Sequence, residues 1–164
     1  DYYKIVSAFD TVGVCAVNDD WGFKTQTVLS PAMMREYVFP WTKKIIQIIH
    51  GNGKPVIFHS CGYLKLIMDE IIDDLKIDAK HSFEDEIYPI EQAYEWWHDR
   101  IALLGGIDVN FLCTKSPAEI KARALKLLKQ TAEFGGYALG SGNSITSYVP
   151  EENYLAMISA ADEF

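Results

Sequence analysis

Hydrophobic residues occur along the chain in two alternating patterns. Short, continuous apolar runs are typical of parallel strands buried on both faces, and they lie at residues 11–17, 55–58, 79–83, 101–104 and 137–139. Between the runs, apolar residues recur at steps of three and four, which predicts amphipathic helices. These helical stretches lie at residues 31–50, 64–75, 90–97, 117–134 and from 150 onward. The alternation predicts about five consecutive β–α repeats, preceded at residues 2–9 by the end of a helix.

Helix-capping signals support two of these helix starts. Ser30-Pro31 and Ser116-Pro117 each place serine at the N-cap and proline at the first helical position. Glu119 completes a capping box with Ser116. Gly51-Asn52-Gly53 predicts the end of the first long helix.

Parallel β–α repeats form either a doubly wound sheet or a (β/α)₈ barrel. The chain lacks the Gly-x-Gly-x-x-Gly fingerprint of dinucleotide folds, and its predicted strands end in polar, mostly glycine-rich segments. This favours an α/β fold of the TIM-barrel type, in which strand ends converge on one active site. A full barrel takes about 250 residues, so residues 1–164 are expected to form one domain that is a partial barrel of about five βα units. The chain begins with Asp1 rather than Met, which indicates processing or a piece of a longer protein.

Composition narrows the function classes. The 164 residues carry a net charge of −8 with no basic cluster, so no nucleic-acid partner is expected. Apolar stretches are too short to cross a membrane, and no signal peptide is recognisable. Three scattered cysteines do not make a disulfide framework, which favours a cytoplasmic location.

The segment His59-Ser60-Cys61-Gly62 follows the second predicted strand. In extended chain, residues two apart point the same way, so His59 and Cys61 can reach a common point. Imidazole and thiolate are preferred zinc ligands, and a catalytic site uses about three protein ligands. Glu84, just after the next strand, can supply a carboxylate. The alternative is a packed histidine beside a buried cysteine.

Other polar residues at strand ends are candidates for substrate binding. Asp20 and Trp21 would place a carboxylate beside an aromatic wall, or else form a turn with an Asp cap. Asp108 is either a pocket carboxylate or a helix cap. Ser141 and Asn143 lie in a glycine-rich segment that can offer N–H groups to an anion, or can form a plain turn.

Three further residues have simpler expected roles. Cys15 and Cys113 lie in or beside apolar runs and are expected in the core. His81, near a strand end, is a weaker pocket candidate.

Taken together, the strand ends resemble the uroporphyrinogen decarboxylase superfamily, which includes cobalamin-dependent methyltransferases. The resemblance rests on ordered blocks over nearly the whole chain: residues 18–22, 30–31, 59–62, 105–108, 139–143 and 150–153. It implies a (β/α)₈ barrel of about twice this length, of which this chain resembles the C-terminal half.

Two branches of the superfamily differ at these blocks. In the decarboxylases the segment matching residues 59–62 is similar to Phe-x-Lys-Gly, and the later block to Leu-Gly-His-Gly. Here His59, Cys61 and Ser141 replace these residues. The methyltransferase branch is similar at His-x-Cys, which implies zinc bound by His59 and Cys61, with Glu84 at the open position and acting in catalysis. The branch also uses a distant cysteine, and residues 140–143 contain none.

The resemblance therefore implies zinc-assisted methyl transfer between a small methylated substrate or a thiol and a corrinoid carried by a partner protein. The first alternative is metal-free decarboxylation of a tetrapyrrole of the uroporphyrinogen type. The second is an inactive fragment or binding module. Because open strand edges need covering, a homodimer is expected.

Overall fold

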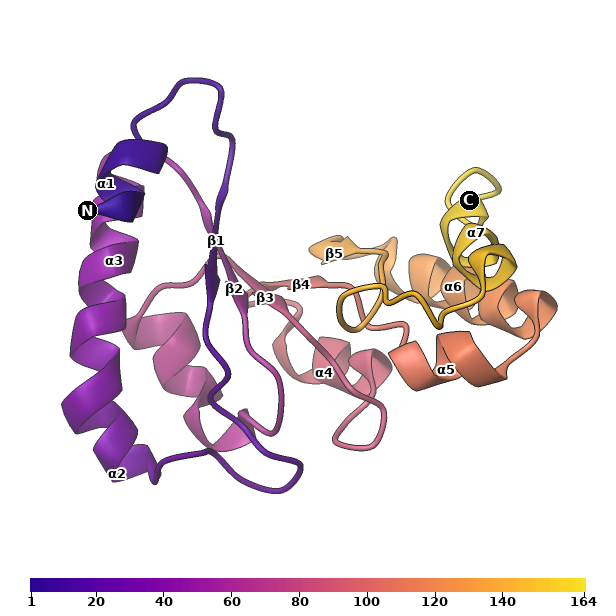
Figure 1. The fold of residues 1–164 in the computed structure, drawn as a ribbon, viewed down its shortest axis with the longest axis horizontal. Helices are drawn as coiled ribbons and strands as arrows, with labels where there is room; N and C mark the ends of the chain where they lie inside the picture. Colours follow the sequence, from indigo (N-terminus) through magenta and orange to yellow (C-terminus); the bar gives the residue numbers. More distant parts are fainter. The chain divides into compact units, whose positions relative to one another are not determined.

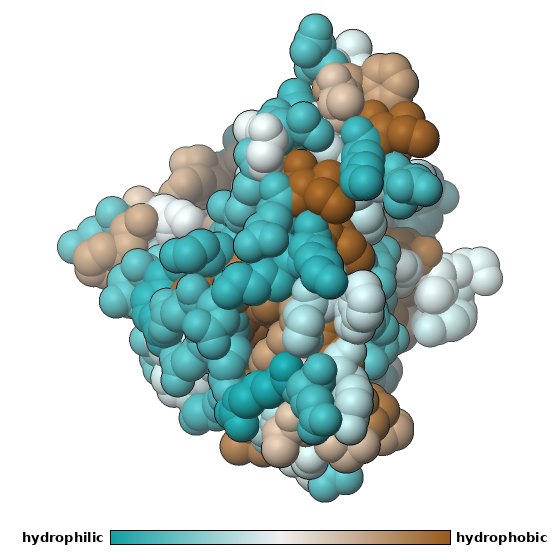
Figure 2. Space-filling model, turned by 90° about the vertical axis from the view of Figure 1, so that its left-hand side faces the viewer, coloured by the Kyte–Doolittle hydropathy of each residue, from teal (hydrophilic) through white to brown (hydrophobic).

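The computed structural model describes all residues, 1–164, which divide into two compact units, Asp1–Lys80 and His81–Phe164 (Figure 1). None of the helices combines the length and the hydrophobicity that a membrane span requires. Seen from the left-hand side of Figure 1, the surface is mainly hydrophilic, with hydrophobic residues in separate patches (Figure 2). We describe each unit by itself.

The strands of the first unit are β1 (Cys15–Asn18) and β2 (Val56–His59). They pair in parallel, with Cys15 opposite Val56 and Asn18 opposite His59. The expected first strand began at residue 11, but the pairing begins only at Cys15, whose N–H donates to the Pro55 carbonyl at 3.0 Å. Pro55 has no N–H to offer, so it limits the ladder at this end.

The first unit contains six helical segments, and α3 lies along α1 in it (Figure 1). They are α1 (Tyr2–Val6), α2 (Pro31–Met33), the π-helix η1 (Met34–Val38), α3 (Phe39–Gly51), the 3₁₀-helix η2 (Lys65–Ile67) and the π-helix η3 (Glu70–Asp74). The predicted start at Ser30 is confirmed, since its side chain accepts a hydrogen bond from the Met33 N–H. The π-helix ends at Val38, two residues before Pro40, which cannot donate the helical hydrogen bond.

The expected single α-helix at residues 64–75 is wrong in detail. The segment forms a 3₁₀ turn followed by a π-helix. Its apolar residues are buried as expected, including Leu64, Ile67 and Ile71. Apolar spacing therefore identified the buried face but not the hydrogen-bond pattern, which the spacing does not determine.

The second unit is built on β4 (Ala102–Leu104) and β5 (Tyr137–Ala138), which also pair in parallel. Its helices are α4 (Ile90–Trp97), α5 (Val109–Thr114), α6 (Pro117–Thr131) and α7 (Glu151–Ser159). Helix α7 packs against α5 and α6 (Figure 1). The Asn153 side chain fixes α7 by donating to the Leu112 and Lys115 carbonyls at 2.6 and 3.0 Å.

Strand β3 (Ala79–His81) spans the division between the units. In the sheet the strands follow the order β1-β2-β3-β4-β5, which is also their order in the chain. Strands joined in this way by helices confirm the expected α/β class and the partial (β/α)₈ barrel.

The three cysteines differ in burial, and all are free thiols. Cys15 is buried in β1, as expected for a core residue. Cys61 and Cys113 are only half-buried. The core placement expected for Cys113 is therefore only partly met, because α5, on which it lies, buries Leu112 instead.

Candidate metal centre

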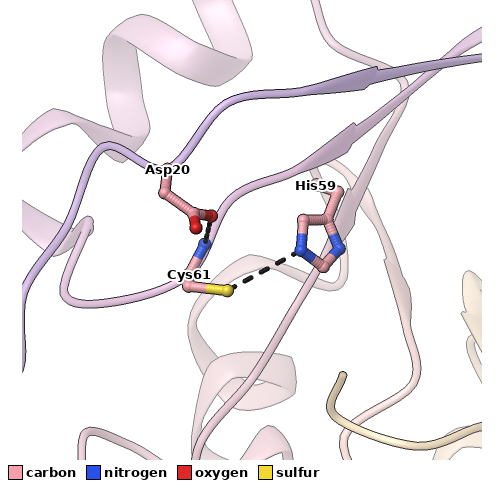
Figure 3. Close-up of side chains that lie close together, drawn as sticks. All are labelled: Asp20, His59 and Cys61. Carbon is pink, nitrogen blue, oxygen red and sulfur yellow. Dashed lines mark hydrogen bonds between the residues drawn. The ribbon is translucent and has the colours of Figure 1, made fainter. Parts of the chain in front are cut away.

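Two neighbouring strand ends bring three potential metal ligands together in the first unit (Figure 3). Asn18 and His59 are the last paired residues of β1 and β2. Asp20 and Cys61 each come two residues after this pair. Because side chains two apart in extended chain share a side, the register places Asp20, His59 and Cys61 at one edge of the sheet.

The distance between two of the three side chains matches the separation of zinc ligands. Cys61 Sγ lies 3.7 Å from His59 Nε2. Ligand atoms of Asp20, His59 and Cys61 all lie within 4.8 Å of one another. Zinc bonds to sulfur and nitrogen in tetrahedral geometry imply a sulfur–nitrogen separation of about 3.6 Å. The histidine and cysteine are therefore already spaced for zinc.

Hydrogen bonding at Asp20 and burial at His59 favour the forms of these two groups that bind metal. The Cys61 N–H donates to Asp20 Oδ1 at 3.0 Å, and this bond is the main reason why the pKa of Asp20 is lowered. Burial lowers the pKa of His59, with a further lowering from Lys80 and an opposing effect of Asp20. Ionised carboxylate and neutral imidazole are the ligating forms, so proton competition with a metal is reduced at neutral pH.

The segment between the two ligands is held by buried polar contacts. Ser60 is fully buried, and its Oγ accepts a hydrogen bond from the Trp21 N–H at 3.0 Å. Its carbonyl accepts a hydrogen bond from Lys80 Nζ at 2.9 Å. Ser60 therefore ties the segment after β2 to the segment after β1.

The same two segments touch through their backbones at Gly22 and Gly62. A Cβ added at Gly22 would lie 2.6 Å from the Tyr63 nitrogen, and Gly62 has a φ of +84°. Only glycine combines this positive φ with so close a backbone approach. The loops that carry Asp20 and Cys61 are thus closely packed against each other.

The structure confirms the spatial pairing expected for His59 and Cys61. It also adds Asp20, which we had expected to line a substrate pocket rather than to accompany these two residues. The sequence did not place Asp20 beside His59 and Cys61, because the register between β1 and β2 cannot be read from residue spacing within one strand. Trp21 is 3% exposed and packs against Phe39 and Phe58. The structure therefore gives Trp21 a packing role, and its contact with a substrate stays a prediction.

Two of the remaining candidates, Asp108 and Glu84, lie in the second unit. Asp108 is the N-cap of α5: its Oδ1 accepts from the Asn110 and Phe111 N–H groups at 2.7 and 3.2 Å. Its Oδ2 accepts from the Asp85 N–H at 3.0 Å. The structure shows the cap that was one alternative for Asp108, and its place in a substrate pocket stays a prediction. The Glu84 carbonyl accepts from the Tyr88 N–H at 3.1 Å, and its place as a metal ligand stays a prediction.

The segment after β5 is organised by its own polar side chains. Ser141 Oγ donates to the Asn143 carbonyl at 2.5 Å, and Asn143 Oδ1 accepts from the Ser144 N–H at 2.8 Å. His81 Nε2 lies 3.1 Å from the Ser141 carbonyl oxygen. The structure shows the turn that was one alternative for these residues, and substrate binding by Ser141 and Asn143 stays a prediction.

Known proteins resemble this chain in sequence and in fold. Uroporphyrinogen decarboxylase from Nitrosomonas europaea is 28% identical over 87% of this chain, and that from Anaeromyxobacter sp. is 26% identical over 83%. These matches span only 39% and 38% of the relatives' own lengths. A methyltransferase from Methanosarcina mazei shares the fold with a TM-score of 0.72 and 23% identity, covering 94% of this chain and 43% of its own.

The family model of uroporphyrinogen decarboxylase matches residues 6–164. This match includes both strand ends of the candidate metal centre and the capped helices of the second unit. The chain therefore belongs to the uroporphyrinogen decarboxylase (URO-D) family.

Proposed function

We propose that this chain carries the metal-binding part of a zinc-dependent methyltransferase. In this proposal His59, Cys61 and Asp20 hold the ion. The fourth position, which the family resemblance assigns to Glu84, is the one that a substrate takes. The methyl group passes between a small methylated substrate or thiol and a corrinoid on a partner protein. Because the chain spans about two fifths of its curated relatives, this activity is proposed for the whole protein.

The observation that carries the proposal is the spacing of the ligand atoms. The 3.7 Å separation of Cys61 Sγ and His59 Nε2 is close to the value of about 3.6 Å for tetrahedral zinc. Nitrogen, sulfur and carboxylate oxygen are the three ligand types that zinc accepts in proteins. Three protein ligands leave a fourth position for substrate, as catalytic zinc sites do.

The side chains of this site suit a divalent cation, which in turn would activate an acidic substrate group such as a thiol. As thiolate and carboxylate, Cys61 and Asp20 would supply negative charge to the ion, and burial lowers the pKa of His59, which favours the neutral, ligating imidazole. When bound, zinc would lower the pKa of a substrate thiol and keep it as the nucleophilic thiolate. In the proposed transfer a carbon–sulfur bond would form as the bond between the methyl carbon and the corrinoid breaks, with the electron pair of the broken bond kept by the corrinoid.

The experiment compares metal binding by the wild type and by Cys61→Ser. We expect the purified wild type to retain zinc through dialysis and, after replacement by cobalt, to show a thiolate-to-cobalt charge-transfer band. The Cys61→Ser variant loses both because hydroxyl binds zinc weakly beside thiolate. Cys113→Ser is the matched control, since that half-buried thiol lies in the second unit. Zinc and the band retained in full by Cys61→Ser would refute the proposal.

Decarboxylation of a tetrapyrrole is the second candidate, because the curated relatives are named uroporphyrinogen decarboxylase. The whole protein would be incubated with uroporphyrinogen, and release of carbon dioxide would be measured. Carbon dioxide release that is unchanged by Cys61→Ser and by zinc removal would favour this candidate over methyl transfer.

A further inference from the structure

The first unit contains a lysine in an unusual position. Lys80 is 1% exposed, which places it among the most buried large side chains of the protein. Lysine is almost never fully buried unless its charge is compensated, because removing an ammonium from water costs several kcal/mol. A lysine kept in such a place therefore indicates a role that an apolar side chain would not supply.

The contact made by Lys80 points to this role. Its Nζ donates to the Ser60 carbonyl at 2.9 Å, and Ser60 is the residue between His59 and Cys61. On its other side, Ser60 Oγ accepts the Trp21 N–H at 3.0 Å. Ser60, which links the two ligands, is thus held at its carbonyl by Lys80 and at its side chain by Trp21 in the segment after β1.

The charge of Lys80 also acts on the ligands. After burial, it is the next cause of the lowered pKa of His59, and it adds to the lowering of the Asp20 pKa that comes mainly from the Cys61 N–H. A cation beneath the site offsets the negative charge that thiolate and carboxylate ligands bring together. Groups that orient metal ligands in this way typically change metal affinity by about 10- to 100-fold.

We infer that Lys80 is a positioning residue of the metal centre: its bond to the Ser60 carbonyl sets the separation of His59 and Cys61. The expected effect of Lys80 on zinc affinity rests on the proposed metal-binding function. Its effect on the separation of His59 and Cys61 concerns the metal-free chain as well. Neither the ammonium nor its carbonyl partner is itself a ligand in this arrangement.

The first test measures zinc affinity by competition with a coloured chelator. Lys80→Met keeps much of the side-chain volume but removes the charge and the donor, and we expect about 10- to 100-fold weaker binding. Lys80→Arg, which retains both, restores most of the affinity. Ile49→Val is the control for general destabilisation, since Ile49 is fully buried in α3 of the same unit and is not one of the proposed ligands. Equal zinc affinity in Lys80→Met and Ile49→Val would overturn the inference.

The second test uses the metal-free chain, so that it decides the inference even where the proposed function fails. The amide hydrogens of Cys61 and Trp21 are bonded to Asp20 Oδ1 and Ser60 Oγ. If Lys80 fixes this segment, both amides exchange with deuterated water about tenfold faster in Lys80→Met, as expected for loss of one hydrogen bond. In Ile49→Val, the Cys61 and Trp21 amides exchange no faster than the lowered global stability of that variant accounts for. A wild type that binds no zinc refutes the proposed function alone, whereas unchanged exchange in Lys80→Met refutes the positioning role.

Discussion

Replacing Asp108 with alanine should lower the free energy of unfolding by about 2 kcal/mol. Two parts of the side chain contribute. Oδ1 caps α5 through the Asn110 and Phe111 N–H groups, and loss of such a cap costs about 1 kcal/mol. Oδ2 accepts the Asp85 N–H at 3.0 Å, and loss of that partner costs about another 1 kcal/mol.

The assay is urea unfolding followed by circular dichroism. With a denaturant dependence of about 2 kcal/mol per molar urea, the midpoint of Asp108→Ala falls by about 1 M. Asp108→Asn is the matched variant, because asparagine caps as well as aspartate while its amide nitrogen cannot accept the Asp85 N–H. The free energy of unfolding of Asp108→Asn should fall by only about half as much as that of Asp108→Ala.

The two variants together separate capping from the bond to Asp85. A decrease below about 0.5 kcal/mol for Asp108→Ala would refute the capping argument. Equal losses in both variants would instead assign the whole effect to the Asp85 contact.

Two further changes test the electrostatics of the second unit and the loop contact of the first. Burial raises the pKa of Glu91, but hydrogen bonds and charge from Arg123 outweigh this and lower it overall. The Glu91–Arg123 pair therefore stabilises the protein at pH values above the pKa of an unfolded glutamate. This stabilisation is lost as the pH falls through the lower pKa of Glu91 in the folded protein. The melting temperature of Glu91→Gln should therefore lie below that of the wild type at neutral pH and approach it in acid. Gly62→Ala should lower the free energy of unfolding by about 2 kcal/mol, because φ is +84° and the new Cβ meets Gly22. Gly51→Ala, which meets no atom within 4 Å, is its control in the same urea assay, and equal midpoints would contradict the close loop contact.

Much of the fold was predictable because several signals are local. The Ser116 capping box forms as expected, with its side chain and that of Glu119 bonded reciprocally at the start of α6. Helix α4 has the bounds expected from its apolar spacing, Ile90–Trp97. Each of these features depends on residues within one or two helical turns.

Features that depend on contacts between distant segments were not predictable in the same way. Helix α5 is only six residues long, which is too short for a periodic signal, and its Asp108 cap was one of two equal alternatives. Asp20 joins His59 and Cys61 only because Asn18 pairs with His59, and a shift by one residue would turn its side chain to the other face. The pairing of His59 with Cys61 was predictable because a single strand end carries both.

In the proposed metal centre, the contact between Gly22 and Gly62 also bears on which ions can be distinguished. Two loops whose backbones touch cannot spread apart without breaking that contact. An ion with longer bonds than zinc would need the donors of Asp20 and Cys61 to separate, and the packed glycines oppose this movement. Size discrimination at the metal would then originate in two residues that have no side chains and bind no metal.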